Sequence, residues 1–107
     1  MAVVVWKYTF SQDLPSISTF SMPIGAKILC VKMMPNGIIS MWALVNKSET
    51  NLEERKFLLV GTGHTIKDQP DSVGLTYIGT VLDTYQAEHN WIENPPVFVW
   101  HIFEVVK

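Results

Sequence analysis

Residues 26–45 read AKILCVKMMPNGIISMWALV, and this stretch decides the fold class of the chain. Two apolar segments, Ala26–Met33 and Ile38–Val45, flank the tripeptide Pro35-Asn36-Gly37. An Asn-Gly pair tolerates the positive φ angles that a type I′ turn demands, and such turns join antiparallel strands. The stretch therefore predicts a β-hairpin closed by a type I′ turn.

The segments on either side of this hairpin are also typical of strands. Val3–Phe10 is rich in β-branched and aromatic residues. Ser11–Pro23 has the composition of turns, although Ile17–Ser21 could form a short edge strand. Leu52–Val60 begins with charges that could start a helix, but its apolar end and the glycine that follows favour a strand.

The last third of the chain continues the β pattern with one interruption. Leu75–Leu82 predicts a strand, and Gly79 within it indicates a bulge or the close approach of another backbone. Asp83–Asn94 has helical leanings, and the pair Pro95-Pro96 ends it. We therefore expect one short helical or loop insertion before the final strand.

The final strand, Val97–Val106, is the most apolar segment of the chain. Side chains alternate along a strand, so one face carries Phe98, Trp100, Ile102 and Glu104. The other face carries Val99, His101, Phe103 and Val105. A strand that is apolar on both faces belongs in a sandwich, in a barrel wall or at a subunit interface. We expect an interface in a homo-oligomer, formed by Phe98, Trp100 and Ile102.

Together these segments predict a mostly β fold. We expect a small antiparallel β-barrel or sandwich of about six strands with one short helical or loop insertion. The 107 residues suit a single β domain that spans residues 1–107. Trp42 and Trp100 are expected in its core, because large rings in apolar strands usually pack there.

Charge is sparse, since only 17% of the residues are charged against 48% that are hydrophobic. This composition suggests a hidden face, either a subunit interface or a ligand pocket, although a dense core with a bland surface has the same composition. The eight Lys and Arg residues are scattered through a chain of net charge −2, without a run that could follow a phosphate backbone. We therefore expect no non-specific binding of nucleic acid.

The sequence also predicts a cytoplasmic protein. Residues 1–7, MAVVVWK, lack the basic start and small-residue cleavage site of a signal peptide. No apolar run approaches the roughly 20 residues that cross a bilayer, so no membrane partner is expected. The lone Cys30 cannot form an internal disulfide, which fits a reducing compartment.

One short motif, Gly61-Thr62-Gly63-His64, is a candidate for ligand binding. Two glycines separated by one residue allow a sharp turn whose N–H groups could hold a phosphate or carboxylate. The alternative is a tight turn in which His64 satisfies backbone groups. Aromatic rings would complete a nucleotide site, and we assign that role to Tyr77 and to Trp91, which lies in a polar loop.

No catalytic or metal-binding pattern is present. The three histidines, His64, His89 and His101, lack the spacing of a zinc site. Cys30 lies among apolar residues of a strand, where a thiol is usually inert packing. Glu53 and Glu54 are adjacent and point to opposite faces of a strand, as solvated charges do. We predict no metal, no cofactor and no catalytic residue, which favours a binding protein over an enzyme.

Five motifs together resemble a family of small uncharacterised bacteriophage proteins. In order they are Met22-Pro-x-Gly25-Ala, Trp42-Ala-Leu-Val45, Gly61-Thr-Gly-His64, Tyr77-Ile-Gly-Thr80 and Val99-Trp-His-x-Phe-Glu104. The resemblance covers nearly the whole chain and departs from the family's pattern in a longer linker over residues 83–96. It implies a phage protein that acts in the host-cell cytoplasm.

Small phage accessory proteins often act against host defence, so the resemblance implies two mechanisms, and a third alternative stands beside them. The first is sequestration of a nucleotide immune signal by a sponge that uses the Gly61–His64 turn and an aromatic ring. The second is an anti-CRISPR-like inhibitor that binds a host defence protein. The third is a small-nucleotide hydrolase with His64 as its base.

Overall fold

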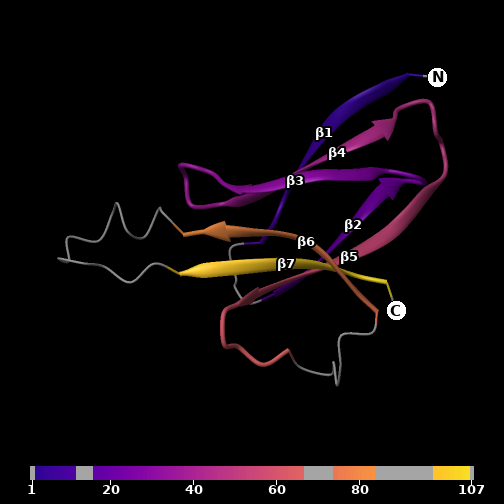
Figure 1. Ribbon diagram of the computed structural model, residues 1–107. Coiled ribbons are helices and arrows are strands. Elements are labelled where there is room, and N and C mark those ends of the chain that lie inside the picture. Colours follow the sequence, from indigo (N-terminus) through magenta and orange to yellow (C-terminus); the bar gives the residue numbers. More distant parts are fainter. Residues whose placement is uncertain (1, 12–15, 67–73, 84–97, 107) are drawn as a thin grey trace.

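Seven strands paired in antiparallel fashion make up the computed structural model, which describes residues 2–11, 16–66, 74–83 and 98–106 (Figure 1). The predicted strands and their order are present, and the possible edge strand at Ile17–Ser21 is a full strand. The seven are β1 (Val3–Thr9), β2 (Ser16–Pro23), β3 (Lys27–Met33), β4 (Ile39–Asn46), β5 (Leu52–Gly61), β6 (Leu75–Leu82) and β7 (Val99–Val105).

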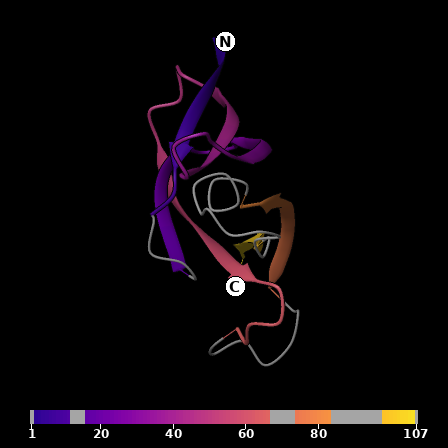
Figure 2. The same cartoon turned by 90° about the vertical axis from the view of Figure 1, so that its left-hand side faces the viewer.

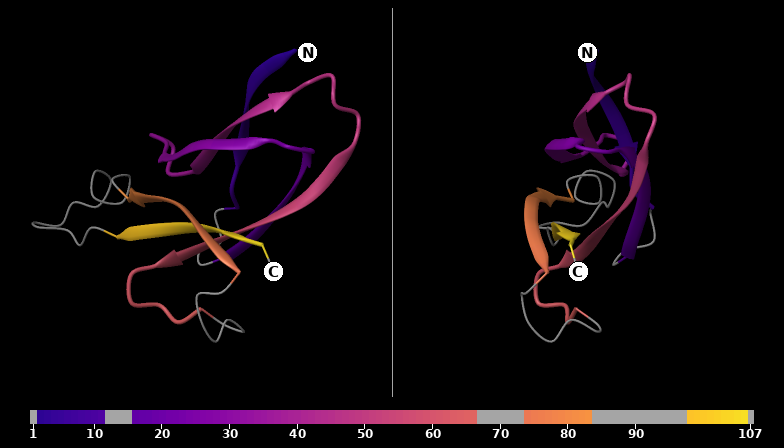
Figure 3. Two further views of the ribbon diagram at one scale, coloured as in Figure 1. Left: turned by 45° about the vertical axis from the view of Figure 1, so that its right-hand side comes forward. Right: turned by 90° about the vertical axis from the view of Figure 1, so that its right-hand side faces the viewer.

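The strands form two sheets, so the fold is a sandwich and not a closed barrel. The three-stranded sheet has the order β1-β4-β3, and the four-stranded sheet has the order β2-β5-β7-β6. Figures 2 and 3 show β5 running from the level of the three-stranded sheet down to that of β7 and β6. The predicted mostly β architecture is confirmed, and β2, which ends at Pro23, lies at a sheet edge where proline is tolerated.

The apolar core lies between the two sheets. Ring centroids of Tyr8, Phe10, Phe20 and Phe57 lie 5.4 to 6.2 Å apart in tilted and edge-to-face pairs, which join β1, β2 and β5. The completely or almost completely buried side chains of the other strands include Val31, Met41, Ala43, Val45, Val81, Trp100 and Ile102. Burial of this shared surface holds the two sheets together.

The β3–β4 hairpin is confirmed, but its turn is not of type I′. The Gly37 N–H donates to the Met34 carbonyl, and Gly37 has a φ of 81°. The Ile38 N–H donates to the side-chain oxygen of Asn36. The β-turn therefore spans residues 34–37, one residue earlier than predicted, with the left-handed Gly37 as its last residue. This is the pattern of a three-residue loop with a glycine bulge, which places Pro35 where a type I turn favours proline.

Gly79 in β6 confirms the predicted bulge, and its close neighbour is a side chain and not the backbone given as the alternative. The pairing register of β6 with β7 shifts between Tyr77 and Gly79, as in a β-bulge. A Cβ atom added at Gly79 would lie 2.7 Å from Cγ2 of Val31 in β3. The absent side chain thus lets β6 of one sheet approach β3 of the other.

The predicted insertion at residues 83–94 lies almost wholly outside the described residues, and so does Trp91. Nowhere in the described ranges is there a helix. A helix able to cross a membrane is accordingly not found in this part of the chain.

Candidate functional site

The Gly61–His64 motif lies at one end of the paired strands β5 and β7, where Gly61 pairs with Trp100. The His64 N–H donates to the Gly61 carbonyl over 3.1 Å, which closes a β-turn. Gly63, the third residue of this turn, has a φ of 84°, which a side chain would disfavour. Gly63 is therefore required by the turn itself.

Gly61 leaves room for the rings of His64 and Trp100. A Cβ atom at this position would lie 2.8 Å from two atoms of the His64 ring and 3.3 Å from the Trp100 ring. The imidazole folds back over Gly61 and meets Trp100 edge-on, with 5.9 Å between ring centroids and 66° between planes. The motif thus places the His64 ring in an edge-to-face contact with Trp100 at the end of the sandwich.

A pocket of about 290 Å³ opens beside the contact between His64 and Trp100. Trp100 is almost wholly buried in its wall, whereas Phe98 is half exposed. The Trp100 indole N–H has no hydrogen-bond partner among the described residues. The pocket is lined by Gly61, Thr62, His64, Phe98, Val99 and Trp100. It combines aromatic walls with two polar side chains, a combination that suits a small ligand with a ring.

The backbone N–H groups of the motif are mostly engaged within the chain. The Thr62 N–H donates to the Val99 carbonyl over 3.2 Å, and the His64 N–H donates to Gly61. The expected nest of free N–H groups therefore lacks these two amides. Two polar side chains line the pocket: the His64 imidazole and Thr62, whose hydroxyl lies 2.7 Å from His101 Nε2.

A row of hydrogen bonds on the outer face of the four-stranded sheet connects Thr62 to Tyr77. Thr62 Oγ1 lies 2.7 Å from His101 Nε2, and His101 Nδ1 lies 3.1 Å from Thr80 Oγ1. Thr80 Oγ1 in turn lies 2.7 Å from the Tyr77 hydroxyl. The Tyr77 ring packs edge-on against Phe103 at 5.8 Å. Two predicted site residues from β6 and from the end of β5 are thereby joined through β7.

His64 and His101 approach the end of β7 from opposite faces. His64 packs on Trp100, which points into the core, and His101 follows Trp100 and points outward. His101 was not among the predicted site residues, although its place between Trp100 and Ile102 puts it opposite the core face. The alternation of β7 was the signal that could have identified it.

The three residues predicted for a subunit interface differ in their exposure: two are buried within the chain and one is exposed. Ile102 is fully buried and Trp100 nearly so, both in the core of a single chain. Phe98 is 50% exposed and lies beside the pocket. The prediction that Trp42 is a core residue is wrong, because Met41 and Ala43 face the core and Trp42 points to the opposite side, half-buried. Cys30 is exposed and is therefore not buried packing.

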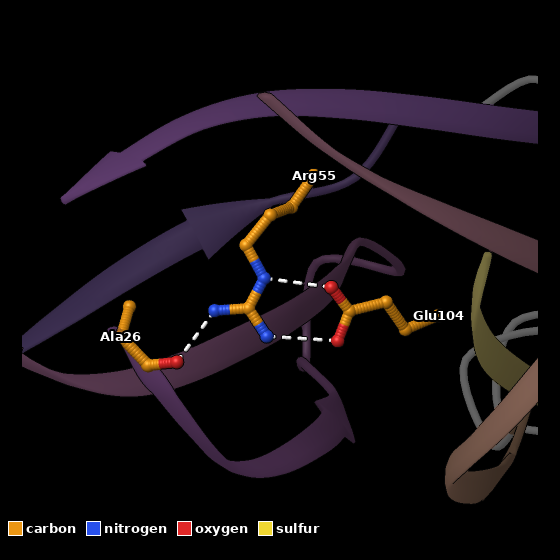
Figure 4. A network of polar contacts seen from close by, with 3 residues as sticks. All are labelled: Ala26, Arg55 and Glu104. Atoms are coloured by element: carbon orange, nitrogen blue, oxygen red, sulfur yellow. Dashed lines mark hydrogen bonds and ion pairs between the residues drawn. The ribbon is translucent and has the colours of Figure 1, made fainter. Parts of the chain in front are cut away.

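The opposite end of the β5–β7 pair holds a charged cluster that the sequence analysis missed (Figure 4). Arg55 of β5 makes two hydrogen bonds to the Glu104 carboxylate of β7, at 2.6 and 2.8 Å. Its third nitrogen donates to the carbonyl of Ala26, just before β3. Glu104 shares the core face with Trp100 and Ile102, and a carboxylate on an apolar face calls for a cation partner. That placement was the signal for Arg55.

This ion pair is largely shielded, with side chains 16% and 13% exposed. Hydrogen bonding to Glu104 is the main reason why the pKa of Arg55 is raised, although burial opposes it. A wider hollow of about 720 Å³ is lined by Gly25, Ala26, Arg55, Glu104 and their neighbours. Since the guanidinium donates both to Glu104 of its own sheet and to Ala26 next to the other sheet, we assign it to holding the sheets together.

No group of three His, Cys, Asp or Glu side chains lies close enough to hold a metal ion in the described part of the chain. The pocket itself offers two aromatic walls, the Thr62 hydroxyl and the His64 imidazole. These groups suit recognition of a flat ring that carries polar substituents.

Comparison with known protein families gives one match. The chain matches the family described as a domain of unknown function (DUF7352) over residues 1–107. No curated protein and no solved structure matches it. The chain belongs to the DUF7352 family.

Proposed function

We propose that this DUF7352 member is a non-enzymatic binding protein that holds a small nucleotide at the Gly61–His64 end of the sandwich. The observation that carries the proposal is the pocket of about 290 Å³ between Phe98 and Trp100, with Thr62 and His64 beside them. Its size is at the small end of the range for ligand sites and suits one nucleoside unit.

The pocket residues supply the two kinds of contact that a nucleotide needs. The half-exposed Phe98 ring offers a stacking surface for a base, a contact that contributes about 1–3 kcal/mol. The His64 imidazole can donate a hydrogen bond to a sugar or phosphate oxygen, and the Thr62 hydroxyl, which also hydrogen-bonds to His101, can share in this contact. Recognition would then depend on side chains, because the Thr62 and His64 amides already have partners.

The biological setting we propose follows from the resemblance to small phage proteins. In that setting the chain would counter host defence by sequestering a nucleotide immune signal in the host cytoplasm. The resemblance rests on five motifs, and two of them, Gly61–His64 and Val99–Glu104, supply every residue of the pocket except Phe98. A sponge needs tight binding and no turnover, which suits a site built from stacking and hydrogen-bonding groups.

Calorimetric titration with cyclic and ADP-ribose-type nucleotides tests this function. We expect saturable binding by the unchanged protein, and Phe98→Ala should weaken it by about tenfold or more because a stacking ring is lost. His64→Ala should weaken it as well. Leu52→Ala changes an exposed side chain at the other end of β5 and is the matched control, with unchanged affinity. Absence of heat with every nucleotide, or equal losses in Leu52→Ala, would overturn the proposal.

A further inference from the structure

The outer face of the three-stranded sheet gathers three lysines around a tryptophan. In the pairing register, Trp42 of β4 lies between Lys7 of β1 and Cys30 of β3. Two residues away along β4, Leu44 pairs with Lys27 and Ser40 pairs with Lys32. Because alternate residues of a strand share a face, all three lysines lie on the same side of the sheet as Trp42. We call Lys7, Lys27, Lys32, Cys30 and Trp42 the lysine face.

This face carries positive charge without compensation from its own sheet. All three lysines and Cys30 are exposed, and Trp42 is half-buried. None of the strands β1, β3 and β4 contains an Asp or Glu residue. The Lys7 ammonium lies 6.0 Å from the centroid of the Trp42 ring. The described acidic residues all lie elsewhere in the fold, at Glu49, Glu53, Glu54, Asp83 and Glu104.

The lysines are scattered in the sequence, a pattern that predicts no non-specific binding of nucleic acid. In the fold, β4 lies between β1 and β3 and brings positions 7, 27 and 32 together. Neighbouring strands lie about 4.8 Å apart, so Lys7 and the β3 lysines are separated by roughly 10 Å across Trp42. Several phosphates of an extended strand fit within such a distance.

We propose that the lysine face binds single-stranded nucleic acid. The lysines contact phosphates, and Trp42 stacks on an unpaired base, as aromatic rings do on other sheet platforms. A duplex keeps its bases stacked inside, so it could use only the lysines. An acidic protein could pair with the lysines too, but it would have no equivalent use for the central ring. This function goes beyond capture of a small nucleotide, and its site lies on the other sheet.

The number of lysines sets the expected strength and salt dependence. Three phosphate contacts on a single strand predict a slope of log K against log salt of about −2. Each lysine removed should reduce the slope by about 0.7 and weaken binding by about tenfold at low salt. Binding should therefore be weak at physiological salt and measurable at low salt.

Fluorescence anisotropy with labelled oligo(dT) and oligo(U) at several salt concentrations tests the proposal. We expect binding with the predicted slope, and Lys7→Gln with Lys32→Gln should lower both affinity and slope. Lys56→Gln, on β5 of the other sheet, is the matched control with an unchanged slope. Trp42→Leu should weaken binding without a change of slope. A circular dichroism spectrum of each variant verifies that it is folded.

The exposed Cys30 provides an independent readout on the unchanged protein. Because Cys30 pairs with Trp42 on this face, bound oligonucleotide should slow the reaction of its thiol with a disulfide reagent. Any of four results would overturn the proposal: no anisotropy change at low salt, equal losses in Lys56→Gln, a preference for duplex, or equally strong competition by poly-glutamate. The last result would assign the face to an acidic protein instead.

Discussion

The two ends of the β5–β7 strand pair use the same backbone ladder for opposite purposes. At the Arg55–Glu104 end, the charged groups satisfy each other and the carbonyl of Ala26, so that each of the three guanidinium nitrogens has a partner. At the Gly61–Trp100 end, a half-exposed ring and an exposed imidazole border a pocket. We infer that the first end maintains the sandwich and the second end is free to bind.

The proposed function assigns stability to one end of the strand pair and recognition to the other. A shielded ion pair that has lost one partner leaves an uncompensated charge, so the Arg55 end cannot change without a large loss of stability. The Gly61 end is held by a turn and an edge-on ring contact, which are easier to alter. The predictions that follow test this separation, in order of their expected effect on stability.

Breaking the ion pair should have the largest effect. Glu104→Gln leaves Arg55 shielded without its anion, so we expect the free energy of unfolding in urea to fall by about 3 kcal/mol. The double variant Arg55→Met with Glu104→Met should lose less than either single variant, since no lone charge remains. Glu54→Gln, an exposed neighbour, should change stability by no more than about 0.5 kcal/mol. If Glu104→Gln were as stable as that control, the ion pair at the Arg55 end would not stabilise the sandwich.

Filling the space at Gly79 should have the second largest effect. Gly79→Ala places a methyl group 2.7 Å from Val31 Cγ2, so we expect a loss of about 1–3 kcal/mol from overpacking between the sheets. In a double-mutant cycle, Val31→Ala should relieve part of this loss. Strictly additive losses in chemical unfolding would contradict the close approach of β6 to β3.

Gly61→Ala should separate binding from stability at the open end. Its methyl group would meet the His64 ring, but this side chain is exposed and can move away. We expect a stability loss below about 1 kcal/mol together with weaker nucleotide binding in calorimetry, because the edge-to-face contact of His64 with Trp100 is disturbed. A stability loss as large as that of Glu104→Gln would show that the Gly61 end also stabilises the sandwich.

A substitution of Tyr8, which lies near Arg55, should have the smallest effect on stability. Its buried hydroxyl has no hydrogen-bond partner among the described residues, and burial raises its pKa above 10.0 although Arg55 opposes the shift. A raised folded pKa means that stability is retained below the unfolded pKa and falls as the pH rises through the folded pKa. Tyr8→Phe should remove this alkaline loss and change stability at neutral pH by no more than about 1 kcal/mol. Unfolding curves measured from neutral to alkaline pH should show an identical alkaline loss in both proteins if this account is wrong.

Most strands could be predicted because their signals are local. The range predicted for β6, Leu75–Leu82, is the range observed, and the bulge at Gly79 follows from one residue type in an apolar strand. β2 was predicted only as a short possibility, because Pro15, Pro23 and several serines resemble a turn. The prediction of a type I′ turn at Asn36-Gly37 was wrong, since residue preference does not decide where the closing hydrogen bond forms.

Contacts between distant strands could not be predicted from the sequence. Arg55 and Glu104 are 49 residues apart and meet only because β5 pairs with β7. The grouping of Lys7 with Lys32 likewise depends on the order β1-β4-β3. Local patterns assign residues to strands and faces, but the partner strand is chosen by packing of the whole core.

The candidate site was predicted in its parts and not in its arrangement. The Gly61–His64 motif was identified from its two glycines, and Tyr77 was added as an aromatic residue. The structure connects Tyr77 through Thr80 and His101 to Thr62, which also lines the pocket. Free amides were expected from the motif alone, and the Thr62 amide is instead engaged by Val99 of β7.

Nuclear magnetic resonance titration of the isotope-labelled protein with a nucleotide tests the central claim most directly. The account predicts that backbone amide shifts change at Thr62, His64 and Val99, and that the amides of Arg55 and Glu104 stay constant. Changes centred on the Arg55 end, or no change at the Gly61 end at saturating nucleotide, would contradict it.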